Sequence, residues 1–188
     1  MHAPLASAML GIALVLAAPT STHAEPTAPA PLAATTQPQA LTLAAVEDFP
    51  DIEAGDAPYY VDKWRKALAI NAGNANLRDK WAKATTAFDG TAGDYDVTLT
   101  TITEFDGECI YRVYVNDELV AEVQNPRVDK DLDMKPHAHA LPKITLAPDD
   151  TIAVASICHS NDLIPEGDGY AWARGRWTTL ELTPAAAE

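Results

Sequence analysis

A stretch near the C-terminus carries side chains suited to holding a sugar. Tyr170, Trp172, Arg174 and Arg176 occupy every second position, with small residues between them and Trp177 directly after them. An aromatic ring packs against the C–H face of a sugar, and planar polar groups satisfy its hydroxyls. The two arginines could instead pair with buried carboxylates or with an acidic sugar such as a uronate. On a continuous strand, the four larger side chains would share one face.

Two histidines at i and i+2 form a second group with chemical potential. On a strand, His137 and His139 would point the same way and could share zinc or copper, with His159 as a third ligand. An exposed polar loop between Pro136 and Pro142 is the simpler interpretation, since no third ligand is placed by the sequence. We expect the loop.

The chain has two cysteines, Cys109 and Cys158. In an oxidising compartment an even pair favours a disulfide, provided that the two strands are adjacent. Closing a loop of about 50 residues would contribute about 4 kcal/mol in the chain-entropy model. The alternatives are two buried free thiols or a metal site at Cys158 and His159. We predict the disulfide.

Catalytic groups are few. Carboxylates for glycoside hydrolysis could come from Glu104, Asp106 and Glu108, but in a tight acidic turn such groups are usually solvated or hold backbone amides. A polysaccharide lyase would need a base and a charge neutraliser in one groove, for which Tyr114, Arg112 and a histidine are candidates. The sequence has no nucleophile elbow, glycine-rich phosphate loop or HExxH motif. It predicts a protein that is not an enzyme.

The charge balance excludes two classes of partner. Among 188 residues, 27 Asp and Glu face 13 Lys and Arg, so the net charge is −14. Binding to nucleic acid needs a cationic surface that displaces counterions, and docking on an anionic membrane needs basic clusters. With 47% hydrophobic and 21% charged residues, the composition is that of a globular domain.

The N-terminal region predicts export. Residues 1–24 contain a short apolar run followed by small residues, which is the anatomy of a signal peptide. Residues 25–40 are rich in Pro, Ala and Thr and predict a linker. The folded domain is expected at 41–184, with a tail at 185–188. The protein is therefore expected to be secreted or periplasmic, with no membrane insertion after signal removal.

The body of the chain predicts β-strands. Apolar and polar residues alternate from Tyr95 to Thr101, and two further alternating runs flank a turn at Asn116 and Asp117. Many strands at about ten-residue spacing predict an all-β sandwich. A helical turn or two is expected within 61–68. Further strands are expected at 41–48, 67–72, 80–88, 144–146, 151–158 and 170–182.

Three segments carry a family resemblance. They are 88–99 (FDGTAGDYDVTL), 104–108 (EFDGE) and 111–116 (YRVYVN). The first matches a G-x-x-G-x-Y-x-V pattern at Gly90, Gly93, Tyr95 and Val97. Together with the closing segment 160–177, they resemble carbohydrate-binding modules of the galactose-binding-like jelly-roll group, families 6 and 35. The resemblance covers about 41–183.

The resemblance implies a jelly roll that binds a poly- or oligosaccharide without catalysis. In such modules loop aromatics and a late-loop Asn contact the sugar, which implies Tyr59, Tyr60, Trp172 and Asn161, beside Arg174 and Arg176 from the alternating stretch. The modules also place a structural calcium ion between the first and last strands, which implies Glu47, Asp48 and Glu181 as ligands.

Two other classes of function stay open. One is a structural or protein-interaction module of the cell envelope, and the other is a small polysaccharide-active enzyme. An open ring face at Tyr59 or Trp172 would favour sugar binding, and an acid and a base converging in one groove would favour the enzyme. Modules of the resembled group usually travel with an enzyme, so an enzyme or envelope partner is expected.

Overall fold

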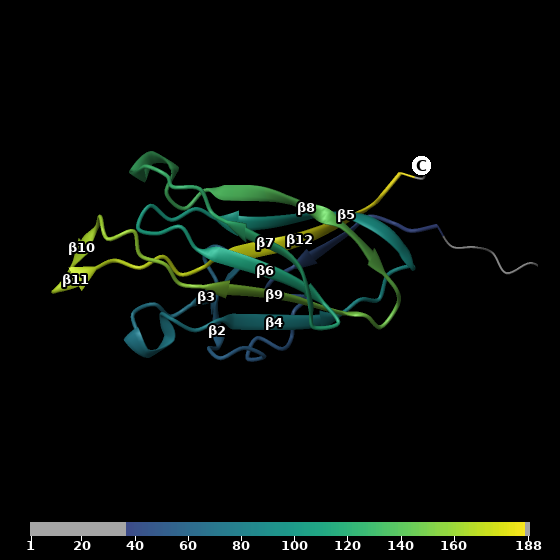
Figure 1. Ribbon diagram of the computed structural model, residues 1–188, viewed down its shortest axis with the longest axis horizontal. Helices are drawn as coiled ribbons and strands as arrows, with labels where there is room; N and C mark the ends of the chain where they lie inside the picture. The colour runs from purple at the N-terminus through teal and green to yellow at the C-terminus, as the bar shows by residue number, and fades with distance from the viewer. Residues whose placement is uncertain (1–36, 187–188) are drawn as a thin grey trace, which may run out of the picture. The chain divides into compact units, whose positions relative to one another are not determined.

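The computed structural model describes residues 37–186, which form two antiparallel sheets packed face to face (Figure 1). The predicted all-β sandwich is confirmed. One sheet has the strand order β2-β3-β12-β5-β8, with β1 paired to β12. Its strands are β1 (Leu41–Ala44), β2 (Tyr59–Asp62), β3 (Ala67–Ile70), β5 (Gly93–Ile102), β8 (Pro136–Leu146) and β12 (Trp177–Pro184).

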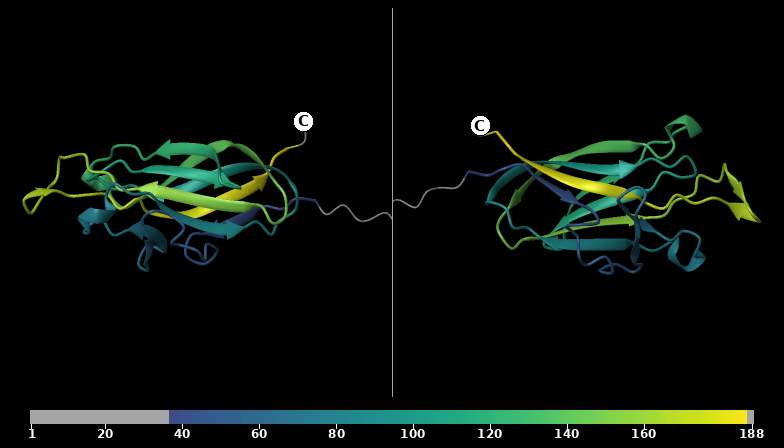
Figure 2. Two further views of the ribbon diagram at one scale, coloured as in Figure 1. Left: turned by 60° about the horizontal axis from the view of Figure 1, so that its bottom comes forward. Right: turned by 180° about the vertical axis from the view of Figure 1, so that it is seen from behind.

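The second sheet has the order β4-β9-β6-β7. Its strands are β4 (Ala82–Ala87), β6 (Ile110–Val115), β7 (Glu118–Gln124) and β9 (Thr151–Ile157). A small hairpin of β10 (Pro165–Glu166) and β11 (Gly169–Tyr170) extends from the end of the sandwich away from the C-terminus (Figures 1 and 2). Two 3₁₀ turns, η1 (Ala75–Leu77) and η2 (Lys130–Leu132), lie at the same end.

The core fills the space between the sheets and follows from the period-two pattern. On β5, Tyr95, Val97 and Leu99 are all buried, while the residues between them are exposed or half-buried. The Trp177 ring at the start of β12 is fully buried and meets Phe49 edge to face, with ring centroids 4.9 Å apart. The turn at Asn116 and Asp117 is confirmed as well, because both residues have positive φ between β6 and β7.

Two predicted elements are wrong in ways that matter for the site. The segment expected to be helical is the hairpin of β2 and β3, because four-residue turn chemistry at 63–66 overrides any helical period. The long closing strand is interrupted: β12 begins only at Trp177. Gly175 has φ +59, and a Cβ there would lie 2.6 Å from Ser156 Oγ, so the chain bends where only glycine fits. The alternating side chains therefore do not share one strand face.

The expected signal peptide and residues 25–36 of the expected linker lie outside the described residues. Within 37–186, no helix is both long enough and apolar enough to cross a membrane.

Candidate functional site

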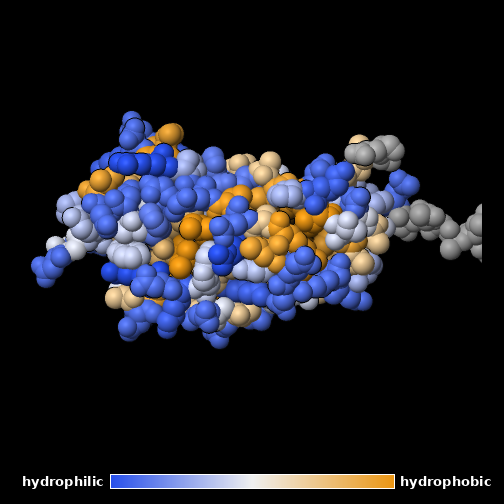
Figure 3. Space-filling view, viewed as in Figure 1, coloured by the Kyte–Doolittle hydropathy of each residue, from blue (hydrophilic) through white to orange (hydrophobic). Residues whose placement is uncertain are grey.

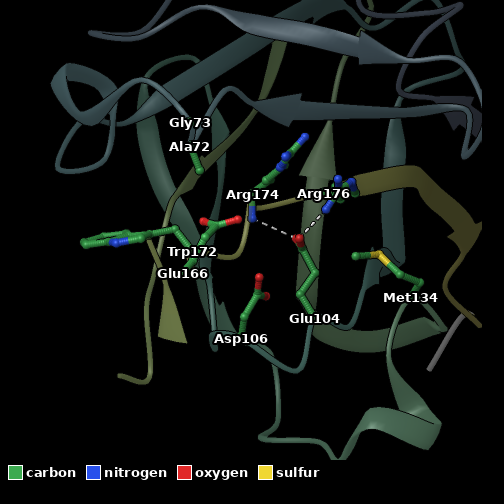
Figure 4. A pocket seen from close by; sticks show the side chains of 9 residues that line it. All are labelled: Ala72, Gly73, Glu104, Asp106, Met134, Glu166, Trp172, Arg174 and Arg176. Carbon is green, nitrogen blue, oxygen red and sulfur yellow. Dashed lines mark hydrogen bonds and ion pairs between the residues drawn. The ribbon is translucent and has the colours of Figure 1, made fainter. Parts of the chain in front are cut away.

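A hollow of about 230 Å³ lies at the end of the sandwich that carries β10 and β11 (Figure 4). Loops from distant parts of the sequence surround it. The lining residues are Ala72, Gly73, Glu104, Asp106, Met134, Glu166, Trp172, Arg174 and Arg176.

The floor is built by the tight turn that follows β5. Glu104 and Gly107 form an isolated antiparallel bridge, so the turn brings Asp106 to the hollow. The turn packs closely against the 159–173 region, since a Cβ at Gly107 would lie 2.1 Å from the carbonyl oxygen of His159. Glycine at this position allows the close approach.

A buried ion network lies beneath the hollow. Arg176, only 4% exposed, donates from Nε to Asp62 Oδ2 at 2.9 Å and from Nη1 to Glu104 Oε2. The other Glu104 oxygen accepts the backbone N–H of Arg174 at 2.9 Å. One of the two roles open to Arg176, that of a buried partner of carboxylates, is what the structure shows. Arg176 also lines the hollow, so a contact with a sugar there stays a prediction.

Burial changes the acidity of both floor carboxyls. It raises the pKa of Glu104 to about 7, although the neighbouring Arg176 guanidinium acts in the opposite direction. Burial also raises the pKa of Asp106. Asp106 Oδ1 is buried and has no hydrogen-bond partner within the described structure, which is uncommon for a buried carboxylate oxygen. Asp106 lines the hollow, so its carboxylate is an acceptor that a ligand in the hollow would lie beside.

Aromatic and cationic groups form the rim. Trp172 is half-buried, and the Arg78 guanidinium lies over its ring, 5.1 Å from the centroid. Arg174 is exposed and donates from Nη1 to the hydroxyl of half-buried Tyr60 at 3.0 Å. Figure 4 shows the Trp172 ring at the edge, directed away from the Glu104–Arg176 pair. Of the residues predicted to bind sugar, Trp172, Arg174 and Arg176 line the hollow, and Tyr60 contacts Arg174.

Two other expected sugar contacts have structural roles. Tyr59 is 4% exposed, packs near Trp177 in the core and donates its hydroxyl to Ser156 Oγ at 2.9 Å. Its ring faces are closed, so the expectation that it offers an open ring face is wrong. Asn161 fastens its loop to the floor turn: its Nδ2 donates to the Phe105 carbonyl at 2.9 Å, and its backbone N–H donates to the carbonyl of Asp106 at 3.0 Å.

The residues implied as calcium ligands do not fit a calcium site. The Asp48 carboxylate accepts the backbone N–H of Ala44 at 2.7 Å. Glu181 lies on β12, directly opposite Thr42 of β1, and Glu47 is exposed in the turn after β1. Nowhere in residues 37–186 do three or more His, Cys, Asp or Glu side chains gather where a metal ion could bind.

The histidines lie on a strand and not in the expected loop. His137 and His139 belong to β8, with ring centroids 4.6 Å apart. His139 is buried, and its Nε2 lies 3.0 Å from Asn125 Oδ1 and 3.1 Å from Thr101 Oγ1. Burial lowers the pKa of His139 to about 4. His159 accepts the backbone N–H of Glu108 through Nδ1 and does not join the pair as a metal ligand.

The predicted disulfide is wrong. The strands are adjacent as required, because Ile110 of β6 pairs with Ile157 of β9, yet Cys109 and Cys158 are both free and buried. Cys109 Sγ instead accepts the backbone N–H of Gly175 at 3.1 Å, which ties the thiol to the bend before β12. The alternative of two buried free thiols describes the structure.

Sequence reasoning missed the convergence of Asp106, Glu166, Met134 and the Ala72–Gly73 backbone on this hollow. Asp106 was considered only as one of three acids in a turn, and the remaining residues gave no signal, because their proximity depends on how loops meet at the end of the sandwich. Ala72, for example, lies 34 positions before Asp106 in the chain.

Aromatic rings and cations also meet on the outer face of the four-stranded sheet. The Arg112 guanidinium lies 4.0 Å from the Trp81 ring centroid, and Lys83 Nζ lies 5.0 Å from that of Tyr114. These residues line a hollow of about 340 Å³ with Ala155 at its base. Figure 3 shows hydrophobic residues gathered in the middle of this face. Trp81 is, like Trp172, a half-buried tryptophan with an arginine guanidinium over its ring.

Several solved structures resemble this chain. The CBM36-1 domain of a multidomain xylanase from the hindgut metagenome of Trinervitermes trinervoides is 10% identical, with a TM-score of 0.48. The match covers 79% of this chain and 100% of that domain. The C-terminal family 6 module of a laminarinase from Zobellia galactanivorans is 10% identical, with a TM-score of 0.44, over 77% of this chain and 99% of that one. A mannanase with a family 35 module from Podospora anserina is 13% identical, with a TM-score of 0.45, over 80% of this chain and 28% of that one.

These similar domains are carbohydrate-binding modules, and families 6 and 35, which the sequence motifs resemble, are among them. No protein-family model matches the chain, and no curated protein matches it.

Proposed function

We propose that this protein binds a glycan without catalysis, at the hollow between Trp172 and Asp106. The observation that carries the proposal is the buried Asp106 Oδ1, which has no partner in the described structure and lies in a hollow rimmed by an indole and a guanidinium. These three groups supply the acceptor, the apolar face and the donor that a sugar ring requires.

The unpartnered carboxylate oxygen gives the hollow its preference for a hydroxyl-rich ligand. A buried acceptor without a hydrogen bond is costly, and a ligand hydroxyl that donates to Asp106 Oδ1 removes that cost. A purely apolar ligand would leave the oxygen unsatisfied. Exposed Arg174 has guanidinium donors beyond the one used by Tyr60, and these can reach ring or hydroxyl oxygens.

The size of the hollow limits what enters it. At about 230 Å³ it is smaller than the roughly 300–1,000 Å³ usual for drug-sized ligands. We infer that one sugar unit or one chain end sits in the hollow, with the rest of the glycan outside along the rim at Trp172.

Glycoside hydrolysis is the second candidate function, because an acid and cations converge here and the pKa of Glu104 is raised to about 7, as in a general acid. The hydrogen bonds of Glu104 favour binding instead. Its two oxygens accept from the Arg174 backbone and from Arg176, which holds the carboxyl as a structural group. A hydrolase would need both Glu104 and Asp106 free to face the glycosidic bond.

The test is affinity electrophoresis of the protein in gels that contain neutral or acidic polysaccharides, followed by titration calorimetry with oligosaccharides of the glycan that retards it. We expect Asp106→Asn and Trp172→Ala to reduce retardation, because each removes one of the ligand contacts. Trp81→Ala is the matched control, since it removes another half-buried, cation-stacked tryptophan from the sheet face.

Several outcomes would overturn the proposal. No retardation by any glycan would favour the envelope interaction module. Loss in Trp81→Ala alone would move the site to the sheet face. Release of reducing sugar by the wild type, abolished in Glu104→Gln, would favour the hydrolase.

The proposal includes the location that the N-terminal sequence predicts. An exported protein meets polysaccharides of the surroundings or of the cell envelope, and an enzyme acting on the same glycan is the expected partner. Cell fractionation with antibody detection tests the export, independently of the binding assay.

A further inference from the structure

The turn between β2 and β3 carries the most exposed large hydrophobic side chain of the described residues. Trp64 is 95% exposed, and its neighbours are Lys63, Arg65 and Lys66. We call Lys63–Lys66 the basic turn. An indole almost wholly in water contributes nothing to the core, so its presence at a turn is informative about binding.

The basic turn is held in one conformation. The backbone N–H of Arg65 donates to the Asp62 carbonyl at 3.1 Å, and Lys66 has φ +50. Asp62 and Ala67 pair across the base of the turn as the last residues of β2 and the first of β3. The Trp64 ring is therefore displayed on a closed hairpin, which lowers the conformational entropy that binding must overcome.

The basic turn is positively charged, whereas the rest of the molecule has a negative net charge. It holds three of the 13 Lys and Arg, and since the net charge is −14, the remainder carries −17. Lys63 and Lys66 make no ion pair with any described residue, and Arg65 lies 3.4 Å from Asp62. Lys63 and Lys66 are therefore available to a partner beside the open ring, and Arg65 shares its charge with Asp62.

We propose that the basic turn binds an acidic polysaccharide, one whose sugar rings carry carboxylate or sulfate groups. This deepens the proposed glycan binding and rests on it. Trp64 provides a flat apolar face for the C–H side of a sugar ring, and the flanking ammonium and guanidinium groups meet its anionic substituents.

The network of ion pairs connects the basic turn to the hollow. Asp62 Oδ2 accepts from Arg65 at the turn and from Arg176, which lines the hollow and pairs with Glu104. The turn and the hollow are thus fixed to one framework, so one glycan chain can meet the same two contact points in every copy of the protein.

A chain-like partner suits the charge distribution better than an anionic membrane does. A polysaccharide strand is narrow, so beyond the basic turn it meets the acidic remainder only at the hollow, and at physiological ionic strength charges beyond about 8 Å are largely screened. A flat anionic bilayer would bring the −17 surface close to its own negative charge.

The experiment compares two triple variants of equal charge in gels that contain polygalacturonate, alginate or a neutral glucan. The turn variant is Lys63→Gln, Arg65→Gln and Lys66→Gln. The matched control is Lys130→Gln, Lys135→Gln and Lys143→Gln, three exposed lysines elsewhere. We expect the turn variant to weaken binding to an acidic glycan about tenfold, from three exposed ion pairs of roughly 1.5- to 5-fold each, while the control stays near wild type.

Two further measurements sharpen the test. Trp64→Ala should weaken binding to the acidic glycan about three- to tenfold, and the fall of affinity with salt should be less steep in the turn variant than in wild type. Neutral-glycan binding at the hollow should be unchanged by both, which separates failure of this proposal from failure of the proposed function.

Four results would overturn the proposal: no binding of acidic glycans by wild type, equal loss in the turn and control variants, no loss in either, or turn-dependent binding to phosphatidylserine vesicles without binding to acidic glycans. If neutral glycans still bind at the hollow in these cases, the proposed function survives. If Asp106→Asn and Trp172→Ala leave all glycan binding intact while the turn variant abolishes it, the hollow is wrong and the turn is right.

Discussion

Replacing Arg176 by Met removes the cation that two buried carboxylates share. Asp62 is 8% exposed and Glu104 is 3% exposed, and Arg176 donates to both. Asp62 keeps Arg65 as a partner and lies nearer the surface. Glu104 keeps only the Arg174 backbone N–H, so it must take up a proton to remain buried without a counter-charge.

The cost of that proton sets the expected effect. In the wild type the pKa of Glu104 is about 7, so the carboxyl is largely protonated at pH 5 and ionised at pH 9. Above pH 7, each pH unit adds about 1.4 kcal/mol to the cost of a proton that only the variant must keep. We therefore expect the loss of free energy of unfolding in Arg176→Met to be about 3 kcal/mol larger at pH 9 than at pH 5.

Urea unfolding followed by tryptophan fluorescence at both pH values measures this difference. Glu104→Gln is the companion variant: it leaves Arg176 paired with Asp62 and keeps an acceptor for the Arg174 N–H. We expect its cost to be smaller at pH 9 than at pH 5, because Gln removes the carboxyl whose raised pKa makes the wild type lose stability as the pH rises. An equal loss for Arg176→Met at pH 5 and pH 9 would contradict the prediction, because the loss would then arise from packing and not from the buried charge.

Three smaller perturbations test other parts of the structure. Burial lowers the pKa of His139 from 6.5 to about 4, so its contribution is complete above pH 6.5 and declines as the pH falls towards 4. His139→Gln should remove about 2 kcal/mol of that decline in urea unfolding, and identical slopes would contradict it. Gly175→Ala should cost about 1–3 kcal/mol in thermal unfolding, because φ +59 strains alanine and its Cβ would meet Ser156; an unchanged melting temperature would show that the bend adapts. Asp48→Ala should cause the same small loss in calcium and in EDTA, because its carboxylate holds the Ala44 N–H; a loss seen only with calcium would restore the calcium site.

Local sequence pattern predicted the sandwich because strand formation depends on near neighbours. The strand at Tyr95 to Thr101 and the left-handed turn at Asn116 and Asp117 each depend on residues only a few positions apart in the chain. The same reasoning failed at 61–68, where a four-residue turn between short strands leaves too few residues for any period to show. It also failed at Gly175, because the sequence does not show that the chain bends there against Ser156 with a positive φ.

The candidate site was predicted in part. The sequence identified the chemistry of Trp172 and Arg174, since aromatic and guanidinium groups are recognisable by type alone. It could not distinguish Tyr59 from Tyr60, which are adjacent in sequence. The β2 strand turns one ring into the core against Ser156 and the other towards Arg174. Which face of an edge strand is buried depends on the sheet packed against it.

Composition and period-two alternation are local properties, so the all-β, strongly acidic chain with aromatic and cationic groups near its C-terminus could be predicted from the residues alone. The meeting of Asp62, Glu104 and Arg176 in one buried network, with Asp106 Oδ1 left unpartnered, depends on the tertiary structure. The three network residues come from the end of β2, the turn after β5 and the bend before β12. Their pairing depends on loop closure and desolvation over many intervening residues, which no local pattern encodes.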